Sequence, residues 1–240
     1  MKALLKKMVD RTALPLTRYI LARIPPRDTI LSEIAKRVAI ECADYVQSNM
    51  QRSIAFDTKS ALWDHALAKI DVDGLFAEFG VFRGASINEI ANKRPNDTIY
   101  GFDSFEGLRE DWAGHDCAKG AFDVGGELPV VAANVRLIKG WFDQTVPEFL
   151  AQHSAPFAFI HCDCDTYEAA ATLLRLIGTR IQSGTVIVFD EYLGYRGWRF
   201  GEFKAWQECV SSSGIVYEYL GFTDLGFAGC PVSIRVLGRS

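Results

Sequence analysis

The sequence predicts a Rossmann-like α/β fold: a seven-stranded, mostly parallel sheet with one antiparallel edge strand, covered by helices, plus an N-terminal helical extension. Three observations lead to this prediction. The apolar segment 75–79 runs into a glycine turn and then into a helix start. Apolar segments then alternate with helical ones, an order that favours parallel strands joined by right-handed crossovers. Several of the apolar segments end in an acidic residue.

The composition is that of an ordinary globular protein, with 49% hydrophobic and 23% charged residues among 240. No apolar run approaches the ~18 residues of a membrane span. There is no secretory signal, and the cysteines form no CxxC pair, so we expect a cytoplasmic protein with reduced thiols. The net charge of −4 argues against a nucleic-acid partner.

Residues 1–54 are predicted to form a helical arm or cap, and residues 55–240 the ligand-binding domain. Residues 1–27 carry seven basic residues and one acid, interleaved with apolar residues. Such an arm either lies on an anionic membrane or packs on its own domain or on a second subunit. Because Pro15 and Pro25-Pro26 interrupt any long helix, packing is favoured, and we expect a homo-oligomer. Helices are predicted from Asp28 to about Val46 and from Thr58 to Lys69.

The segment 75–79 is predicted to be a buried strand with Glu78 near its end. Gly80 and Gly84 open a turn where the backbone can approach a ligand. Ser86 stands three residues before Glu89, the spacing of a capping box at a helix start. Strand, glycine turn and helix N-terminus form the first unit of a nucleotide-binding fold.

The second strand, 98–102, ends at Asp103. Asp103 follows Gly84 by 19 residues, near the ~20-residue spacing at which an acid hydrogen-bonds ribose hydroxyls. The segment 104–134 has little periodicity, and a structureless loop of this length is usually a lid or binding loop. After the third strand, 135–138, the pair Trp141-Phe142 is predicted either to stack on adenine or to pack in the core.

The fourth strand, 157–162, is followed by Asp163 and Asp165, and the fifth, 184–189, by Asp190-Glu191. Helices are predicted over 167–181 and 202–210. The segments 216–219 and 232–236 are close together and form a hairpin, which makes the edge strand antiparallel.

The acidic residues at the strand ends should meet at one edge of the sheet, where parallel α/β sheets bind ligands. Four carboxylates on adjacent strands repel one another unless a cation or a proton lies between them, which favours a metal site. His161 is predicted to be a core histidine or a base. Cys162 and Cys164 are expected to be small apolar fillers, since thiolates suit softer metals.

The glycine turn has no tight G-x-G-x-x-G and the chain has no G-x-x-x-x-G-K-[ST], which argues against pyrophosphate and ATP. An acid at the end of the first strand suits the cationic amino-acid part of S-adenosylmethionine. Four ordered motifs complete the pattern: EFGVFRG at 78–84, GFDSFEGL at 101–108, HCDCDTY at 161–167 and VFDEY at 188–192.

Over roughly residues 55–237, these motifs resemble the macrocin O-methyltransferase (TylF-type) family of class I S-adenosylmethionine-dependent methyltransferases. The resemblance implies a divalent metal, usually Mg²⁺, held by Asp163, Asp190 and Glu191. It implies catalytic roles for Asp163 and for Asp165, the latter as a further ligand or general base. Many members have Asp-Asp where this chain has Asp190-Glu191, and the longer Glu shifts the coordination geometry. The donor contacts implied or expected are Glu78, Gly80, Phe82, Arg83, Gly84, Ser86, Asp103, Ser104, Trp141, Phe142 and Asp163.

The sequence therefore predicts an S-adenosylmethionine-dependent O-methyltransferase acting on a hydroxyl of a sugar or small natural product, with help from a divalent metal. An alternative is a non-catalytic S-adenosylmethionine-binding partner module in a glycan or natural-product pathway. A third hypothesis is a nicotinamide-dependent oxidoreductase of similar architecture.

Overall fold

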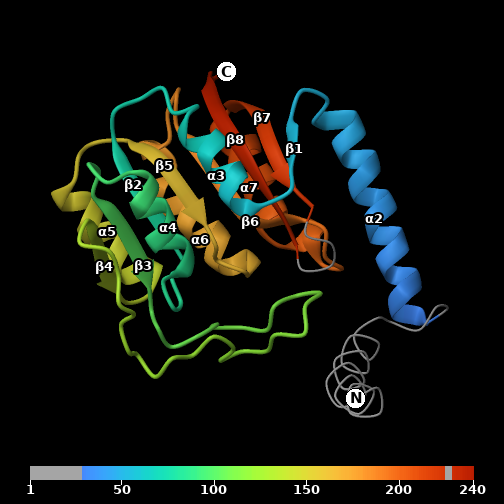
Figure 1. The fold of residues 1–240 in the computed structure, drawn as a ribbon, viewed down its shortest axis with the longest axis horizontal. Coiled ribbons are helices and arrows are strands. Elements are labelled where there is room, and N and C mark those ends of the chain that lie inside the picture. The colour runs from blue at the N-terminus through green and yellow to red at the C-terminus, as the bar shows by residue number, and fades with distance from the viewer. Residues whose placement is uncertain (1–28, 225–228) are drawn as a thin grey trace, which may run out of the picture. The chain divides into compact units, whose positions relative to one another are not determined.

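The computed structural model describes residues 29–224 and 229–240 (Figure 1). The chain divides into two units, residues 1–41 and 42–240, and of the first unit only residues 29–41 are described. The basic arm predicted for residues 1–27 lies outside the described residues, and the boundary predicted after residue 54 stays a prediction. Among the described helices, none has the length and apolar character needed to cross a membrane.

The helices and strands follow one another in the alternating order that the sequence predicts. They are α2 (Ile30–Asn49), β1 (Ile54–Phe56), α3 (Lys59–Leu67), β2 (Leu75–Phe79), α4 (Ala85–Lys93), β3 (Ile99–Asp103), β4 (Val135–Lys139), α5 (Phe142–Gln152), β5 (Phe157–Cys162), α6 (Tyr167–Ile177), η1 (Gly178–Arg180), β6 (Val186–Leu193), η2 (Trp198–Phe200), α7 (Glu202–Ser213), β7 (Ile215–Thr223) and β8 (Cys230–Arg239).

The strands form one mixed sheet in the order β1-β7-β8-β6-β5-β2-β3-β4. This corrects the predicted sheet in two respects. The described sheet has eight strands, because the short strand β1 adds in parallel to β7. The antiparallel strand is β8, and it lies between β6 and β7 and not at an edge. The hairpin was predicted correctly, but its second strand inserts next to β6, where it is hydrogen-bonded on both sides.

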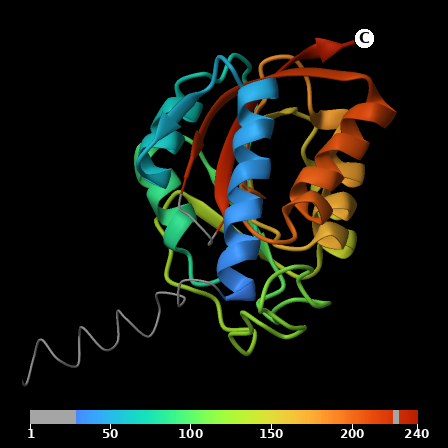
Figure 2. The same cartoon turned by 90° about the vertical axis from the view of Figure 1, so that its right-hand side faces the viewer.

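Helices cover both faces of the sheet. On one face, α3 packs on β6, β7 and β8, and α4 packs on β3 and β4. On the other face, α5 packs on β3, α7 packs on β6 and β7, and α6 contacts both α5 and α7. Figure 2 shows α6 and α7 on the side opposite α3 and α4. Large apolar side chains fill the space between the layers, among them Leu62, Ile87 and Phe159, each at most 1% exposed. Two covered faces explain why β2 and β5 are almost continuously apolar.

Two local differences from the prediction affect the site. Helix α4 begins two residues earlier than the capping-box pattern indicates, with Gly84 in place of Ser86 as the N-cap and no side-chain hydrogen bond at the cap. The Ser86 hydroxyl instead donates to Glu78 at 2.9 Å. Strand β6 continues to Leu193, so Asp190 and Glu191 lie within the strand and not after it.

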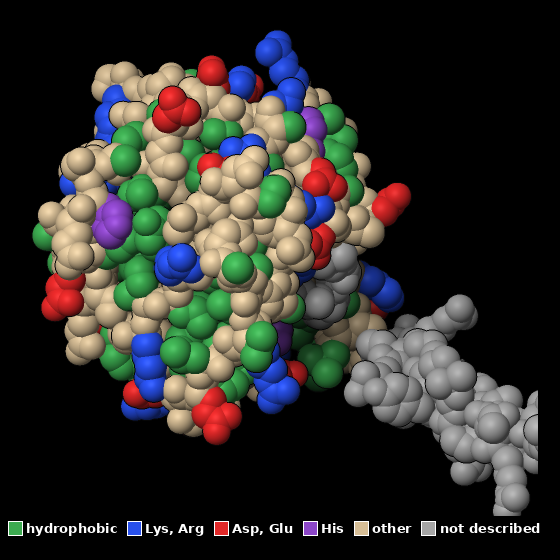
Figure 3. Space-filling view, turned by 60° about the vertical axis from the view of Figure 1, so that its left-hand side comes forward, with side chains coloured by type: hydrophobic (Ala, Val, Ile, Leu, Met, Phe, Trp, Pro, Cys, Tyr) green, Lys and Arg blue, Asp and Glu red, His purple; other side chains and the backbone are tan. Residues whose placement is uncertain are grey.

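The surface carries both signs of charge. On the face shown in Figure 3, Lys and Arg side chains alternate with Asp and Glu, and hydrophobic side chains lie between them. This distribution agrees with a modest net charge of −4.

Candidate active site

A cavity of about 670 Å³ opens at the carboxyl ends of β2, β3 and β5, where a parallel sheet places its ligand. The loop 104–134 supplies one wall, as expected of a binding loop. The residues that line the cavity are Gly80, Phe82, Asp103, Ser104, Gly107, Leu108, Arg109, Glu110, Trp112, His115, Phe122, Gly140, Trp141, Phe142, Asp143, Asp163, Cys164, Asp165, Thr166, Glu168, Ala169, Thr172 and Glu191.

The glycine turn after β2 is held from two sides. Gly80 has a φ of +94°, and a Cβ there would lie 1.8 Å from the carbonyl oxygen of Asp163, so no other residue fits. The Asp103 carboxylate accepts hydrogen bonds from the backbone N–H groups of Val81 and Phe82, at 2.8 and 2.7 Å. The turn therefore presents backbone and the Phe82 ring to the cavity in a fixed shape.

Aromatic side chains line the same end of the cavity. Trp141 and Phe142 begin helix α5, and the guanidinium of Arg109 from the long loop lies 4.1 Å from the centre of the Trp141 ring. Arg109 also donates two hydrogen bonds to Asp143, at 3.1 and 2.9 Å. Both Trp141 and Phe142 line the cavity, and Phe142 also packs edge-to-face on the buried Phe79 with ring centres 5.7 Å apart, so stacking on a ligand and core packing both stay predictions.

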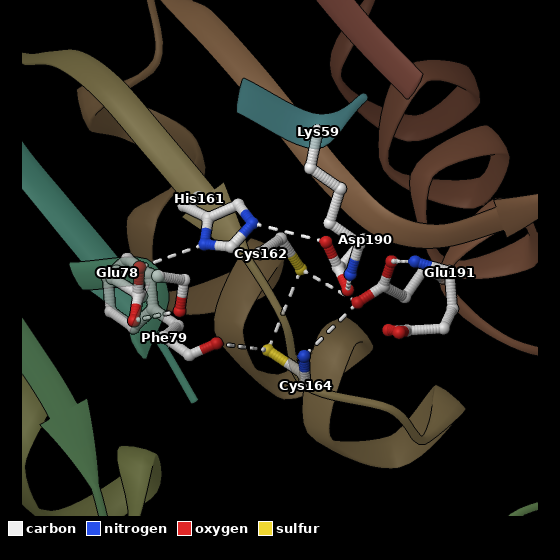
Figure 4. A network of polar contacts seen from close by, with 10 residues as sticks. Lys59, Glu78, Phe79, His161, Cys162, Cys164, Asp190 and Glu191 are labelled. Carbon is white, nitrogen blue, oxygen red and sulfur yellow. Dashed lines mark hydrogen bonds and ion pairs between the residues drawn. The ribbon is translucent and has the colours of Figure 1, made fainter. Parts of the chain in front are cut away.

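A row of ionisable side chains runs along the α3 face of the sheet (Figure 4). Glu78 and His161 are neighbours in the β2–β5 register, and His161 Nδ1 lies 2.9 Å from Glu78 Oε2. His161 Nε2 lies 3.5 Å from Asp190 Oδ1, and Lys59 forms an ion pair with the other oxygen of Asp190. Glu78 and His161 are completely buried and Asp190 is 4% exposed. The row therefore alternates acidic and basic side chains, but His161 Nε2 and Asp190 Oδ1 have no hydrogen-bond partner among the described residues. Single ligand atoms of His161, Asp190 and Asp163 lie within 4.8 Å of one another, so this group too could hold a metal ion.

The charges in this row follow from their neighbours. Burial alone would lower the pKa of His161, but its contacts with Asp190 and Glu78 outweigh burial and raise the pKa to about 10. Burial would raise the pKa of Asp190, but His161 and Lys59 outweigh it and hold the pKa well below its usual range. At neutral pH, a cationic His161 thus lies beside an anionic Asp190. His161 is a core histidine, as one of the two predictions had it.

A second carboxylate cluster lies inside the cavity. Single ligand oxygens of Asp163, Asp165 and Glu191 lie within 4.8 Å of one another. Burial, followed by the negative charge of Asp190, raises the pKa of Asp163, raises that of Glu191 and raises that of Asp165 to about 7. Asp165 has a φ of +63°, a strained conformation for a residue with a side chain. Strain of this kind is common at functional sites.

Glu202 of α7 supports the cluster from the other face of the sheet. Its carboxylate accepts hydrogen bonds from the backbone N–H groups of Cys164 and Glu191, both at 3.1 Å. Cys162 and Cys164 fill the space around it, and Cys162 is completely buried. The two thiols are not the purely apolar fillers that the sequence led us to expect, because Cys162 Sγ donates to Glu202 at 3.5 Å and Cys164 Sγ donates to the carbonyl oxygen of Phe79 at 3.6 Å.

The structure brings together most of the residues that the sequence singled out, but not all. Gly80, Phe82, Asp103, Ser104, Trp141, Phe142, Asp163, Asp165 and Glu191 line the cavity, and Glu78, Arg83, Gly84, Ser86 and Asp190 do not. Glu78 was predicted to contact the methyl donor, but its side chain does not line the cavity. One of its oxygens is hydrogen-bonded to Ser86 and the other lies 2.9 Å from His161. Glu78 and Ser86 support the turn from beneath.

Several residues of the cavity and of the charged row beside it have no signal in the sequence that points to the site. Trp112 and His115 stack on each other in the long loop, with ring centres 4.1 Å apart, and both line the cavity. Lys59 reaches Asp190 from a helix 131 positions away in the chain. The one available signal was that Lys59 is a basic residue at the start of a helix predicted to lean on the acidic edge of the sheet.

Fold and site together define a Rossmann-like protein with an acidic cavity at the carboxyl ends of its strands. Residues 77–192, which run from β2 to β6, match the family model described as a methyltransferase domain. No protein of curated function matches the sequence.

Solved structures share the fold. CalS11, described as a calicheamicin methyltransferase, is 21% identical with a TM-score of 0.56, over 87% of this chain and 94% of that protein. An apo structure of CalS11, described as a TDP-rhamnose 3'-O-methyltransferase, is also 21% identical, with a TM-score of 0.51 over 87% of this chain and 96% of its own. The chain thus has the Rossmann-like fold of these proteins, and its residues 77–192 match a methyltransferase-domain model.

Proposed function

We propose that this protein is an S-adenosylmethionine-dependent O-methyltransferase that methylates a hydroxyl of a sugar or small natural product. The observation that carries the proposal is one cavity with two different ends. One end has the glycine turn, Asp103 and the Trp141-Phe142 pair, and the other has Asp165 and its neighbouring acids. A donor and an acceptor bound at the two ends would meet between them.

At the donor end, the chain offers backbone groups, a carboxylate and aromatic rings. Asp103 keeps lone pairs free beside the three backbone N–H groups it already binds, at 2.8, 2.7 and 2.6 Å, and these can accept ribose hydroxyls. Trp141 and Phe142 can stack on adenine. The acidic lining, including Asp163, favours a cationic sulfonium compound over an anionic nucleotide.

At the acceptor end, Asp165 is placed to take a proton. Methyl transfer is an in-line displacement by a hydroxyl oxygen, which is a poor nucleophile until its proton leaves. Burial raises the pKa of Asp165 to about 7, so its carboxyl matches a general base working near neutral pH. Trp112 and His115 offer a flat wall on which a ring-shaped acceptor can pack. Alignment of two bound reactants supplies much of the remaining rate enhancement.

The acids at this end fit a divalent cation. Carboxylate oxygens are the ligands that Mg²⁺ prefers, and Asp163, Asp165 and Glu191 bring one each to within 4.8 Å of the others. The buried Oε2 of Glu191 has no hydrogen-bond partner among the described residues. When bound, Mg²⁺ would lower the pKa of the acceptor hydroxyl and hold its oxygen in place. The four sequence motifs support assignment to the TylF-type family. We also expect a homo-oligomer. Small hydroxylated molecules are the acceptors that we propose.

The test begins with binding. Titration calorimetry should detect S-adenosylhomocysteine, and Trp141→Ala should weaken its binding by about tenfold, the effect of losing one aromatic stacking partner. Phe200→Ala is the matched control, because this aromatic side chain is 63% exposed and does not line the cavity. Binding of NAD in place of S-adenosylhomocysteine would instead establish the oxidoreductase hypothesis.

Turnover is tested with S-adenosylmethionine and a panel of hydroxylated glycosides and phenols, with products detected by mass spectrometry. Asp165→Asn should keep donor affinity and reduce methyl transfer by about 10²- to 10⁴-fold, the usual contribution of a general base. Donor binding without methylation of any panel member, and with no effect of Asp165→Asn, would favour the non-catalytic partner module.

A further inference from the structure

The cavity has more acidic side chains than the proposed function uses. Among the described residues that line it there are seven carboxylic acids, one arginine and no lysine. Asp103 accepts three backbone hydrogen bonds, and Asp143 is paired with Arg109 at 2.9 Å. Three more acids form the cluster proposed to hold a divalent cation. The carboxylates of Glu110 and Glu168 have no role in that scheme.

Glu110 and Glu168 reach the cavity from two different elements. Glu110 is a half-buried residue of the long loop, and Glu168 is in the first turn of α6. Neither carboxylate has a hydrogen-bond or ion-pair partner within residues 29–224 and 229–240. The positive end of the α6 dipole favours an acid at Glu168, but it leaves the negative charge in place. Both charges are therefore available to a ligand in the cavity.

The long loop also supplies a flat aromatic wall. Trp112 follows Glu110 by two residues, and its ring stacks on His115 with ring centres 4.1 Å apart and planes 12° from parallel. Both rings line the cavity, and Trp112 is only 5% exposed. The Nδ1 atom of His115 is buried and has no hydrogen-bond partner in the described structure. The wall thus combines aromatic faces with a polar atom that a ligand can satisfy.

Glu191 adds a second unsatisfied atom, from strand β6. Its side chain is 7% exposed and lines the cavity, and its Oε2 atom is buried without a hydrogen-bond partner among the described residues. A buried carboxylate oxygen in this state calls for a cation or a hydrogen-bond donor from outside the chain. The cavity therefore suits ligands that bring positive charge and N–H donors.

Carboxylates and aromatic faces together are the groups that recognise an ammonium ion. The ammonium is attracted by the negative charge, donates N–H bonds to the carboxylate oxygens and lies favourably over a π face. An anionic acceptor, such as a nucleoside diphosphate sugar, would instead meet two unbalanced acids. The arginine of the cavity wall offers it little, because both of its terminal nitrogens already donate to Asp143.

We propose that the acceptor carries a cationic amine in addition to the hydroxyl that receives the methyl group, and that Glu110, Glu168 and the Trp112–His115 stack form the subsite for this amine. These four residues determine specificity, since none of them is assigned to donor binding or to removal of the hydroxyl proton. The proposal rests on the proposed function, because it names the class of acceptor for that active site.

The test is the binding of two matched series of probes to the full-length protein, measured by titration calorimetry with and without saturating S-adenosylhomocysteine. The phenols are tyramine, tyrosol and para-hydroxyphenylacetate, and the glycosides are aminoethyl, hydroxyethyl and carboxymethyl β-glucoside. Within each series the scaffold is constant and the end group is an ammonium, a hydroxyl or a carboxylate. In at least one series, the ammonium member should bind at least about tenfold more tightly than the hydroxyl member, and the carboxylate member should bind most weakly.

The double variant Glu110→Gln/Glu168→Gln removes both charges and keeps the shape of the side chains. In this variant the ammonium and hydroxyl members should bind within about threefold of each other. Glu127→Gln is the matched control, because Glu127 is an exposed acid of the same loop that does not line the cavity. Its preference for the ammonium member should stay within about twofold of the wild-type value, because solvent and salt screen a distant charge. Circular dichroism and S-adenosylhomocysteine titration of every variant control for folding.

Two outcomes overturn the proposal. One is a wild-type protein that binds neither ammonium probe more tightly than its hydroxyl partner. The other is a double variant that keeps the wild-type preference, which would place the selecting charge elsewhere. Binding of S-adenosylhomocysteine with no preference among the probes would refute this inference alone, whereas the expected preference without any binding of S-adenosylhomocysteine would refute the proposed function alone.

Discussion

Removing the carboxylate of Asp103 should both destabilise the fold and weaken donor binding. The carboxylate accepts three backbone hydrogen bonds, from Val81 at 2.8 Å, Phe82 at 2.7 Å and Phe105 at 2.6 Å. Two of these donors have positive φ angles, +49° for Phe82 and +60° for Phe105. A non-glycine residue keeps such a conformation only when its surroundings hold it there. Asp103 therefore fixes the glycine turn and the start of the long loop at once.

The magnitude follows from the three bonds. Hydrogen bonds to a charged group are worth about 1.5–3 kcal/mol each when buried. Water can replace part of this at a half-exposed site, so about 1 kcal/mol each, or about 3 kcal/mol for Asp103→Ala, is a reasonable value. For a chain of this size, a loss of about 3 kcal/mol lowers the Tm by about 6–12 °C. Asp103→Asn retains one acceptor oxygen and should lose about half as much.

Differential scanning calorimetry measures the Tm, and titration with S-adenosylhomocysteine measures the donor affinity of the same samples. Asp111→Ala is the matched control, because this carboxylate lies in the same loop but accepts one backbone bond, from Lys119 at 2.8 Å, at an exposed position. Its loss should cost less than about 1 kcal/mol. If Asp103→Ala lowers the Tm no more than Asp111→Ala does, the role of Asp103 in holding the turn is refuted.

Two further predictions concern regions away from the cavity. Trp206, which is completely buried in α7, should cost about 3–5 kcal/mol of unfolding free energy when replaced by alanine, measured by urea denaturation, while the exposed Phe200→Ala should change it by less than about 0.5 kcal/mol. A Trp206→Ala loss below about 1 kcal/mol would contradict the packing argument. The hydroxyl of Tyr219 lies 2.6 Å from that of Tyr45 and 3.0 Å from that of Tyr192. Burial raises the pKa of Tyr219 and of Tyr45 above the unfolded-state value of about 10. The protonated hydroxyls therefore contribute their full free energy of unfolding below about pH 10, and this contribution is lost as the pH rises above it. Between pH 9 and 11, the Tm of the wild type should fall more steeply than that of Tyr219→Phe, and equal slopes would refute this.

The strands were predictable where their ends carry a chemical boundary. β2 and β5 have the predicted bounds, because each is an apolar run that is followed at once by a glycine or an acid. The long loop was predictable for the opposite reason, since 104–134 has no period that a helix or strand could use. In both instances the local sequence and the final environment agree.

The errors have a different origin, which is that tertiary partners override local patterns. Ser86 has the spacing of a capping residue, but its hydroxyl binds Glu78. Helix α5 was not predicted, and Pro147 lies inside it, where proline usually ends a helix. β6 extends past Asp190 because its end is paired again with β8, Leu193 with Cys230. None of these partners is adjacent in the sequence.

The extension of β6 by four residues decides how the acidic site is built. If the strand ended at Phe189, Asp190 and Glu191 would be free to turn toward one ion. The resemblance to the TylF-type family implies this arrangement. In the structure the two acids lie where the β6–β8 register shifts between Phe189 and Leu193, an irregularity that changes the direction of side chains locally. Asp190 finds Lys59 and His161 on the α3 face. Burial, followed by the negative charges of Asp190 and Asp163, raises the pKa of Glu191. The oxygens of the nearby Glu202 are bonded to backbone N–H groups. The extended end of β6 therefore brings one acid to two basic side chains and the next acid to the lining of the cavity.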